Sequence, residues 1–246
     1  MGAELVAERL AQVRDRIAKA GASPSSVRVV AVTKGFGSEA VEAAVGAGLL
    51  DLGENYAQEL LSKASTAPSG VRWHFLGGLQ RNKLARLVPH VHLWQGLDSV
   101  EGALGLARRR PAAAVLVQVR ATAAGESDRS GEGNLAGDGG PVRARRHGAS
   151  VSEVPALVES ARAAGLDVRG LMAVGRAHAA REEARRTFRD VASLASTLGL
   201  SEVSMGMSDD FELAVAEGAT IIRLGRALFG ERPPAHVPGR GAARLG

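Results

Sequence analysis

The chain has 246 residues, of which 45% are apolar and 23% charged, so wholesale disorder is excluded. It contains no cysteine, which excludes disulfides, thiolate metal sites and cysteine nucleophiles and is typical of a reducing compartment. The net charge of +5 is accompanied by 3% aromatic residues, too few to stack the bases of a nucleic acid. No basic and apolar leader opens the sequence, and no apolar run approaches about 18 residues. We therefore expect a cytoplasmic globular protein that binds neither nucleic acid nor membrane.

The predicted elements alternate between helix and strand along the chain. A leading helix is expected over 3–20. Eight short apolar runs follow it, and several are β-branched and continuously apolar, as in parallel strands that are covered on both faces. These runs are 27–32, 49–53, 71–76, 91–94, 114–119, 168–174, 202–205 and 220–224.

Helical segments separate these strands, and three of them begin with a recognisable cap. Ser38 and Ser99 are expected N-caps, and Asp209 with Glu212 three residues later has the spacing of a capping box. Eight β/α units in about 250 residues match a (β/α)8 TIM barrel, here with an extra N-terminal helix. An open, doubly wound sheet is the alternative. The helices are expected over 39–47, 82–88, 100–110, 154–164, 179–198 and 211–217.

The segment 123–149 interrupts this rhythm. It is rich in Gly, Ser, Asp and Arg and has few large apolar residues, so it cannot bury much surface. We expect a mobile loop insertion after the fifth strand. A linker between domains is the alternative, but the same alternation of strand and helix resumes beyond it. One domain over 1–246 is the prediction.

In a TIM barrel the functional residues lie at the carboxyl ends of the strands, and Lys34 follows the first strand directly. An ammonium group at the top of an apolar strand is poorly solvated, so we expect its pKa to fall toward neutrality. The neutral amine could then attack an aldehyde and form a Schiff base. Of the other three lysines, Lys19 and Lys63 are expected on helix surfaces. Lys83, after the third strand, is the rival candidate.

Two glycine-containing loops follow the seventh and eighth strands. Gly206, Met207 and Ser208 precede a predicted helix, whose N-terminus would offer free N–H groups. Gly225 follows the last strand, with Arg223 near the same rim. These are the two loops that usually form the phosphate site of phosphate-binding barrels. Together with Lys34 they predict a site for a phosphorylated aldehyde.

At these residues the sequence resembles the pyridoxal phosphate homeostasis protein family, whose members are alanine-racemase-like barrels. The resemblance covers the chain except residues 121–149 and the last dozen. Its motifs are specific in sequence, order and spacing. They are VAVTK at 30–34, GENYAQE at 53–59, WHFLG at 73–77, QRNK at 80–83, GLMA at 170–173, MGMSDD at 205–210 and RLGRALFG at 223–230.

The resemblance implies a cofactor and a function. Lys34 would carry pyridoxal 5′-phosphate (PLP) as a Schiff base. The protein would be a monomeric, non-catalytic carrier or regulator of PLP that serves PLP-dependent apo-enzymes. Asn55 and Met172 would line the ring pocket. The residues around the phosphate and pyridine would be Ser204, Gly206, Met207, Ser208, Arg223 and Gly225.

A PLP-dependent amino-acid racemase is the alternative. Racemisation needs a base on each face of the substrate, and Lys34 could serve one face. In racemases of this fold type the other base is a tyrosine from a separate domain of the partner subunit, for which we expect a 246-residue chain to have no residues left. The single tyrosine, Tyr56, is expected to pack its ring at the start of a helix. His74 is expected to be a hydrogen-bonded core residue.

A cofactor-free class I aldolase is a third possibility. It would use Lys34 together with a nearby carboxylate, for which Asp51 and Glu54 are the candidates. No metal site is predicted, because the six histidines are scattered and no pair has helical ligand spacing beside a carboxylate.

Overall fold

A computed structural model describes residues 2–120, 148–175 and 180–232, and its elements alternate as expected from the sequence. The strands are β1 (Arg28–Val32), β2 (Asp51–Glu54), β3 (Arg72–Phe75), β4 (Val91–Leu97), β5 (Ala114–Val119), β6 (Asp167–Ala173), β7 (Glu202–Ser204) and β8 (Ile221–Leu224). The helices are α1 (Ala3–Lys19), α2 (Ser38–Gly46), α3 (Ala57–Ala64), α4 (Arg81–Leu87), α5 (Val100–Ala107), α6 (Val154–Ala163), α7 (Arg181–Thr197), α8 (Phe211–Ala216) and α9 (Arg226–Phe229).

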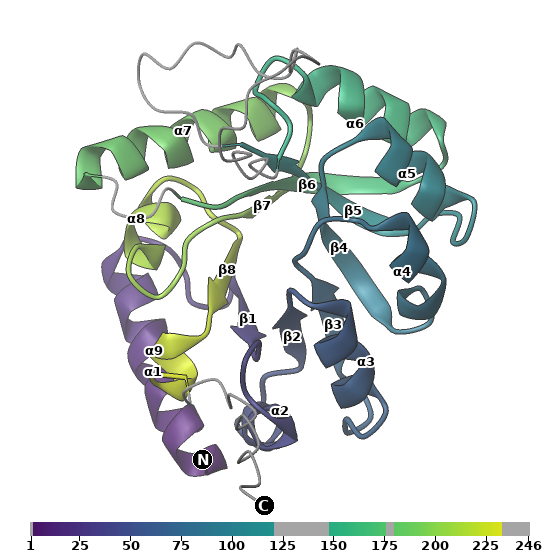
Figure 1. Ribbon diagram of the computed structural model, residues 1–246. Helices are drawn as coiled ribbons and strands as arrows, with labels where there is room; N and C mark the ends of the chain where they lie inside the picture. The colour runs from purple at the N-terminus through teal and green to yellow at the C-terminus, as the bar shows by residue number, and fades with distance from the viewer. Residues whose placement is uncertain (1, 121–147, 176–179, 233–246) are drawn as a thin grey trace, which may run out of the picture.

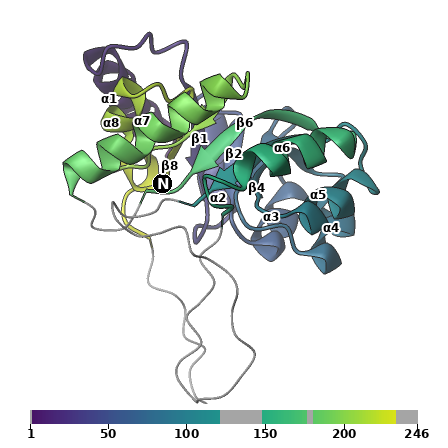
Figure 2. The same ribbon diagram turned by 90° about the horizontal axis from the view of Figure 1, so that it is seen from above.

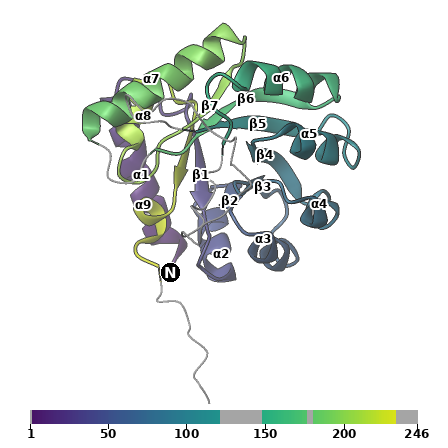
Figure 3. The ribbon, with the colours of Figure 1, turned by 45° about the horizontal axis from the view of Figure 1, so that its top comes forward.

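The eight strands form a closed parallel barrel in chain order. The barrel closes where Arg28–Ala31 of β1 pairs with Ile221–Leu224 of β8 (Figure 1). An open, doubly wound sheet would have two edge strands that each pair on one side alone, whereas here every strand pairs on both sides. The prediction of a TIM barrel is therefore confirmed, and the doubly wound alternative is wrong. Figure 3 shows the helices arranged around the ring of strands.

The extra N-terminal helix is also present. Val6, Leu10, Val13 and Ile17 recur at three- and four-residue spacing and are buried, which gives α1 one apolar face. This face packs against α2, α8 and α9. In Figure 2, α1, α7 and α8 lie together on the opposite side of the barrel from α3, α4, α5 and α6.

Side chains alternate between the inside of the barrel and the layer under the helices, as the two-residue period of a strand requires. Val30, Leu93, Leu116, Met172 and Ile221 belong to a compact cluster that fills the barrel interior. Their neighbours in sequence belong to the larger core beneath the helices. Continuing the alternation of β1 places Lys34 on the inner side and Thr33 on the outer side.

The predicted helix caps are correct at one of three helices. The Ser99 hydroxyl accepts a hydrogen bond from the Gly102 N–H at 3.2 Å and caps α5. Ser38 is the first residue of α2 and not its cap, because Gly37 takes the N-cap position. The capping box is also wrong: Asp209 pairs with Arg226 and Glu212 pairs with Arg16, so neither carboxylate caps α8.

Most of the predicted insertion, residues 123–147, lies outside the described residues. Its last two residues are described. The Ala149 N–H donates to the Gln118 carbonyl, and the Arg120 N–H donates to the Ala149 carbonyl, both at 2.8 Å. The chain therefore rejoins the barrel beside the end of β5.

Candidate functional site

Lys34 lies two residues beyond β1 and is half-buried at the carboxyl end of the barrel. Burial lowers the pKa of its amine, and the positive charges of Arg232 and Arg223 lower it further, against the smaller opposing effects of Glu54 and Glu59. A larger fraction of the amine is therefore neutral near pH 7 than for an exposed lysine. This environment suits a nucleophile that attacks a carbonyl carbon.

Lys63 is not on the helix surface as expected. Its side chain is 6% exposed, and its ammonium donates to the Glu54 carboxylate at 2.5 Å and to the Thr33 carbonyl at 2.8 Å. The sequence does contain a signal for this: Ala57, Leu60 and Lys63 recur every three residues, and all three are buried on the face of α3 that covers the barrel. The expectation of a surface position is wrong because the helical position of Lys63, and not its charge, determines which side of α3 it occupies.

Glu54, the last residue of β2, is fully buried under α3. Its Oε1 accepts from the Thr33 hydroxyl at 2.7 Å as well as from Lys63, while its Oε2 has no hydrogen-bond partner. Burial raises the pKa of this carboxyl even though Lys63 and Thr33 act in the opposite direction. Glu54 therefore lies close to Lys34, but its hydrogen bonds tie it to the layer outside the barrel.

The β7–α8 and β8–α9 loops meet as predicted. The Ala227 N–H donates to the Ser208 hydroxyl at 3.1 Å and joins the two loops. Gly206 has a φ of +90°, and a Cβ atom there would lie 2.6 Å from the Ala214 Cβ, so both conformation and space require glycine. Gly225 is the N-cap of α9. The Met207 N–H already donates to the Asp210 carboxylate at 2.6 Å, so it is not a free donor of the kind predicted.

Arg223 lies inside the barrel and is 5% exposed. Its Nη1 donates to the carbonyl and hydroxyl oxygens of Ser204, and its Nη2 donates to the Ala173 carbonyl, each at 2.8 Å. Burial lowers the pKa of the guanidinium to about 10, and the charge of Asp210 acts in the opposite direction. Because these three acceptors are neutral, the buried positive charge is only partly balanced. The charge of Arg223, which also acts on the Lys34 amine, therefore suits an anionic ligand at this end of the barrel.

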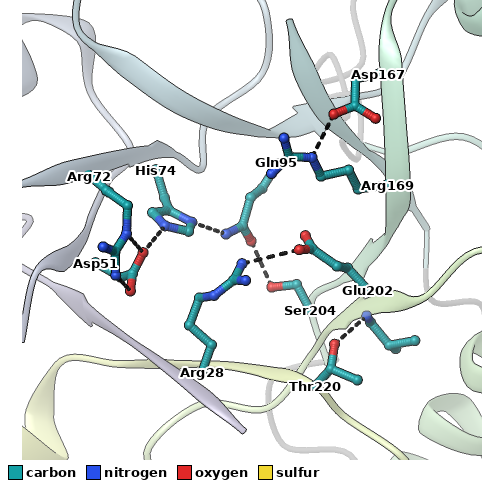
Figure 4. A network of polar contacts seen from close by, with 11 residues as sticks. Arg28, Asp51, Arg72, His74, Gln95, Asp167, Arg169, Glu202, Ser204 and Thr220 are labelled. Atoms are coloured by element: carbon teal, nitrogen blue, oxygen red, sulfur yellow. Dashed lines mark hydrogen bonds and ion pairs between the residues drawn. The ribbon is translucent and has the colours of Figure 1, made fainter. Parts of the chain in front are cut away.

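A chain of hydrogen bonds runs from Ser204 across the barrel interior (Figure 4). The Ser204 hydroxyl donates to the Gln95 side-chain oxygen at 2.6 Å, the Gln95 amide donates to His74 Nδ1 at 2.8 Å, and His74 Nε2 donates to Asp51 at 2.9 Å. Arg72 donates twice to the same carboxylate. His74 is therefore a hydrogen-bonded core residue, as predicted. The pattern of partners requires the neutral form with the proton on Nε2, and burial lowers the pKa of His74 accordingly.

Asn55 follows β2 at the carboxyl end and is half-buried. Met172 is 1% exposed on the inner side of β6 and packs in the interior cluster. Asp51 begins β2, so it lies at the opposite end of that strand from Asn55 and cannot serve as a carboxylate beside Lys34. Tyr56 is 62% exposed at the N-cap of α3, and the expectation that its ring packs is wrong.

Among the residues that the structure describes, no helix combines the length and the apolarity needed to span a bilayer. Among the same residues, no three His, Asp or Glu side chains gather in a way that could hold a metal ion.

Comparison with known proteins agrees with this architecture. The family model of the alanine racemase N-terminal domain matches residues 7–233. The pyridoxal phosphate homeostasis protein of Deinococcus radiodurans is 40% identical over 227 residues, which cover 89% of this chain and 97% of that protein. PipY of Synechococcus elongatus PCC7942, solved with PLP bound, has a TM-score of 0.74 and 30% identity, and the match covers 92% of this chain and 100% of PipY.

A more distant likeness concerns the fold alone. Alanine racemase of Clostridium difficile 630 has a TM-score of 0.67 at 12% identity, and the match covers 94% of this chain but 58% of the racemase. The barrel is therefore shared with racemases, whereas the sequence similarity over nearly full length is to the homeostasis proteins. The chain belongs to the pyridoxal phosphate homeostasis protein family, within the alanine racemase N-terminal domain class.

Proposed function

We propose that this protein is a non-catalytic, monomeric carrier of PLP in the cytoplasm and that it supplies the cofactor to PLP-dependent apo-enzymes. The observation that supports it most is the half-buried Lys34 amine at the end of the barrel where Arg223 is buried with neutral partners. An amine with a lowered pKa beside fixed positive charge suits a ligand with both an aldehyde and a phosphate. The relative PipY, solved with PLP bound, supports the same ligand.

In this proposal the Lys34 amine attacks the aldehyde carbon of PLP. A carbon–nitrogen double bond forms, and the aldehyde oxygen leaves as water, which gives a Schiff base. The bound cofactor supplies an electron-withdrawing ring, and the chain supplies its position. Arg223 and Ser204 would face the cofactor from inside the barrel, Gly206, Met207, Ser208 and Gly225 would surround the phosphate, and Asn55 and Met172 would line the ring.

The racemase alternative requires a second base opposite Lys34. Among the described residues, the two carboxylates that act on Lys34 are both held by other groups: Glu54 by Lys63 and Thr33, and Glu59 by the Gly35 N–H. Tyr56 is largely exposed to solvent. These contacts favour a carrier over a racemase.

Addition of PLP to the apo-protein tests this proposal. We expect the visible absorption band of a protein Schiff base to appear at one PLP per chain, and borohydride to fix the cofactor covalently. Incubation of the loaded protein with L-alanine should give no D-alanine, and mixing with a PLP-dependent apo-enzyme should restore that enzyme's activity. A protein that stays colourless would refute PLP binding. D-alanine formation that is lost in Lys34→Ala would refute the carrier.

Replacing Arg223 by alanine is expected to weaken PLP binding by about tenfold to a hundredfold. A hydrogen bond to a charged group contributes about 1.5–3 kcal/mol, and the buried guanidinium also holds Ser204 and Ala173 in place. Equilibrium titration of the absorption band measures this change. Arg189→Ala is the matched control, because Arg189 lies on α7 and forms an exposed pair with Glu217, the C-cap of α8. Equal PLP affinity in the two variants would contradict the assigned position of Arg223.

A further inference from the structure

The peptide segment that carries Lys34 is held on both sides by residues of β2 and α3. On one side, the Thr33 carbonyl accepts from Lys63 at 2.8 Å and the Thr33 hydroxyl donates to Glu54 at 2.7 Å. On the other side, the Gly35 N–H donates to Glu59 at 2.8 Å. The same three side chains, Glu54, Glu59 and Lys63, therefore contact the residue before Lys34 and the residue after it.

Within this cluster Lys63 takes up both carboxylates. Its ammonium lies 2.5 Å from Glu54 Oε1 and 3.3 Å from Glu59 Oε2. Lys34 has no hydrogen-bond or ion-pair partner among the described residues, although both carboxylates are near enough to act on its charge. Two lysines thus compete for the same pair of carboxylates, and the buried one, Lys63, holds them.

We propose that Lys63 is a positioning residue for Lys34: it anchors the Thr33 carbonyl and occupies Glu54 and Glu59, which leaves the Lys34 amine free of a carboxylate partner and reactive toward an aldehyde. The proposal rests on the proposed function for the identity of that aldehyde. Removal of Lys63 would leave two negative charges beside the Lys34 peptide, and a nearby opposite charge favours the ammonium form of a lysine. The other charged groups that face Lys34, Arg223 and Arg232, stay in place.

The pKa of the Lys34 amine can be measured in the apo-protein, without any cofactor. Acetic anhydride acetylates neutral amines, so the rate of Lys34 acetylation as a function of pH, quantified on the Lys34 peptide by mass spectrometry, reports the pKa of that amine. In Lys63→Met we expect this pKa to rise by at least one unit, and PLP capture at pH 7 to slow by about tenfold for each unit. Lys63→Arg, which keeps a cation, should remain near the wild type.

Two further variants separate the effect on charge from a loss of structure. In Glu54→Gln/Lys63→Met the buried charges are removed together, so the Lys34 pKa should return toward the wild-type value. In Glu54→Gln alone it should fall below the wild type, because one carboxylate is lost while Lys63 still holds Glu59. If the Lys63→Met protein does not fold because Glu54 is left buried and unpaired, these two variants still decide the matter.

An unchanged Lys34 pKa in folded Lys63→Met would overturn the proposal, since the freed Glu54 would then simply take up a proton. It would also be overturned if Glu54→Gln and the double variant had the same Lys34 pKa. If the wild-type protein and all of the variants fail to capture PLP, the proposed function is refuted instead. The acetylation profiles would still test the role of Lys63 in that case.

Discussion

Replacement of Lys34 by alanine is expected to abolish covalent attachment of PLP while leaving the barrel folded. Lys34 is the lysine at the carboxyl end of the barrel with a lowered pKa and without a carboxylate partner among the described residues. In a variant without this amine, borohydride should fix no cofactor on the chain, and the visible absorption band should be absent. Mass spectrometry of the borohydride-treated protein and its peptides measures the result directly.

Lys83→Ala is the matched control, because Lys83 was the rival candidate and the structure places it exposed on α4. It should load PLP like the wild type. The Lys34 variant should be no less stable than the wild type. Folding lowers the pKa of the Lys34 amine from its ordinary value of 10.5, so at a pH below 10.5 the ammonium form destabilises the folded state, and its removal should not lower the free energy of unfolding. Fixation of PLP in Lys34→Ala, or its loss in Lys83→Ala, would contradict the assignment.

Replacement of Asp51 by alanine is expected to lower the free energy of unfolding by about 3 kcal/mol at pH 7. The Asp51 carboxylate accepts from the fully buried His74 ring and from two nitrogens of Arg72. Without it, the Nε2–H of His74 has no acceptor inside the barrel, and the chain of hydrogen bonds that reaches Ser204 loses its end (Figure 4). Denaturant unfolding followed by circular dichroism measures the loss.

The effect of Asp51 should depend on pH in one direction. Burial would raise the pKa of this carboxyl, but the hydrogen bonds from His74 and Arg72, together with the positive charge of Arg72, outweigh burial and hold the pKa well below its usual range. Its stabilising contribution is therefore complete above the ordinary value of 3.8 and is lost as the pH falls below it. A stability difference that vanished between pH 7 and pH 3.8 would contradict this. Asp167→Ala is the control, because it removes an exposed pair with Arg169 and should lower the free energy of unfolding by about 0.5 kcal/mol.

The barrel could be predicted because its information is local. Each strand of the closed barrel coincides with one of the eight apolar runs to within three residues at either end. The rim position of Lys34 and the meeting of the Gly206 and Gly225 loops follow from the same rule, since all eight strands of a parallel barrel end at one rim.

Three of the errors share a cause: residue type and immediate neighbours in sequence do not determine the environments of Tyr56, Lys63 and Asp209. In the structure, Asp209 pairs with Arg226 from a distant segment, and Lys63 lies on the buried face of α3 and pairs with Glu54. Glu59 and Gln95 were missed for the same reason, because nothing in their own segments announces Gly35 or Ser204 as a partner.

The sequence by itself therefore determined the architecture and placed Lys34, the lysine of the proposed site, at the carboxyl end of the barrel, because apolar periodicity and strand order encode these directly. Tertiary structure decided which charges are buried and how they are paired. A burial pattern repeats every two residues along a strand and about every 3.6 along a helix and can be counted. The partner of a buried charge is whichever group the packing brings within about 3 Å, and in this chain the partners of Lys63, Asp51 and Arg223 come from separate elements of the barrel.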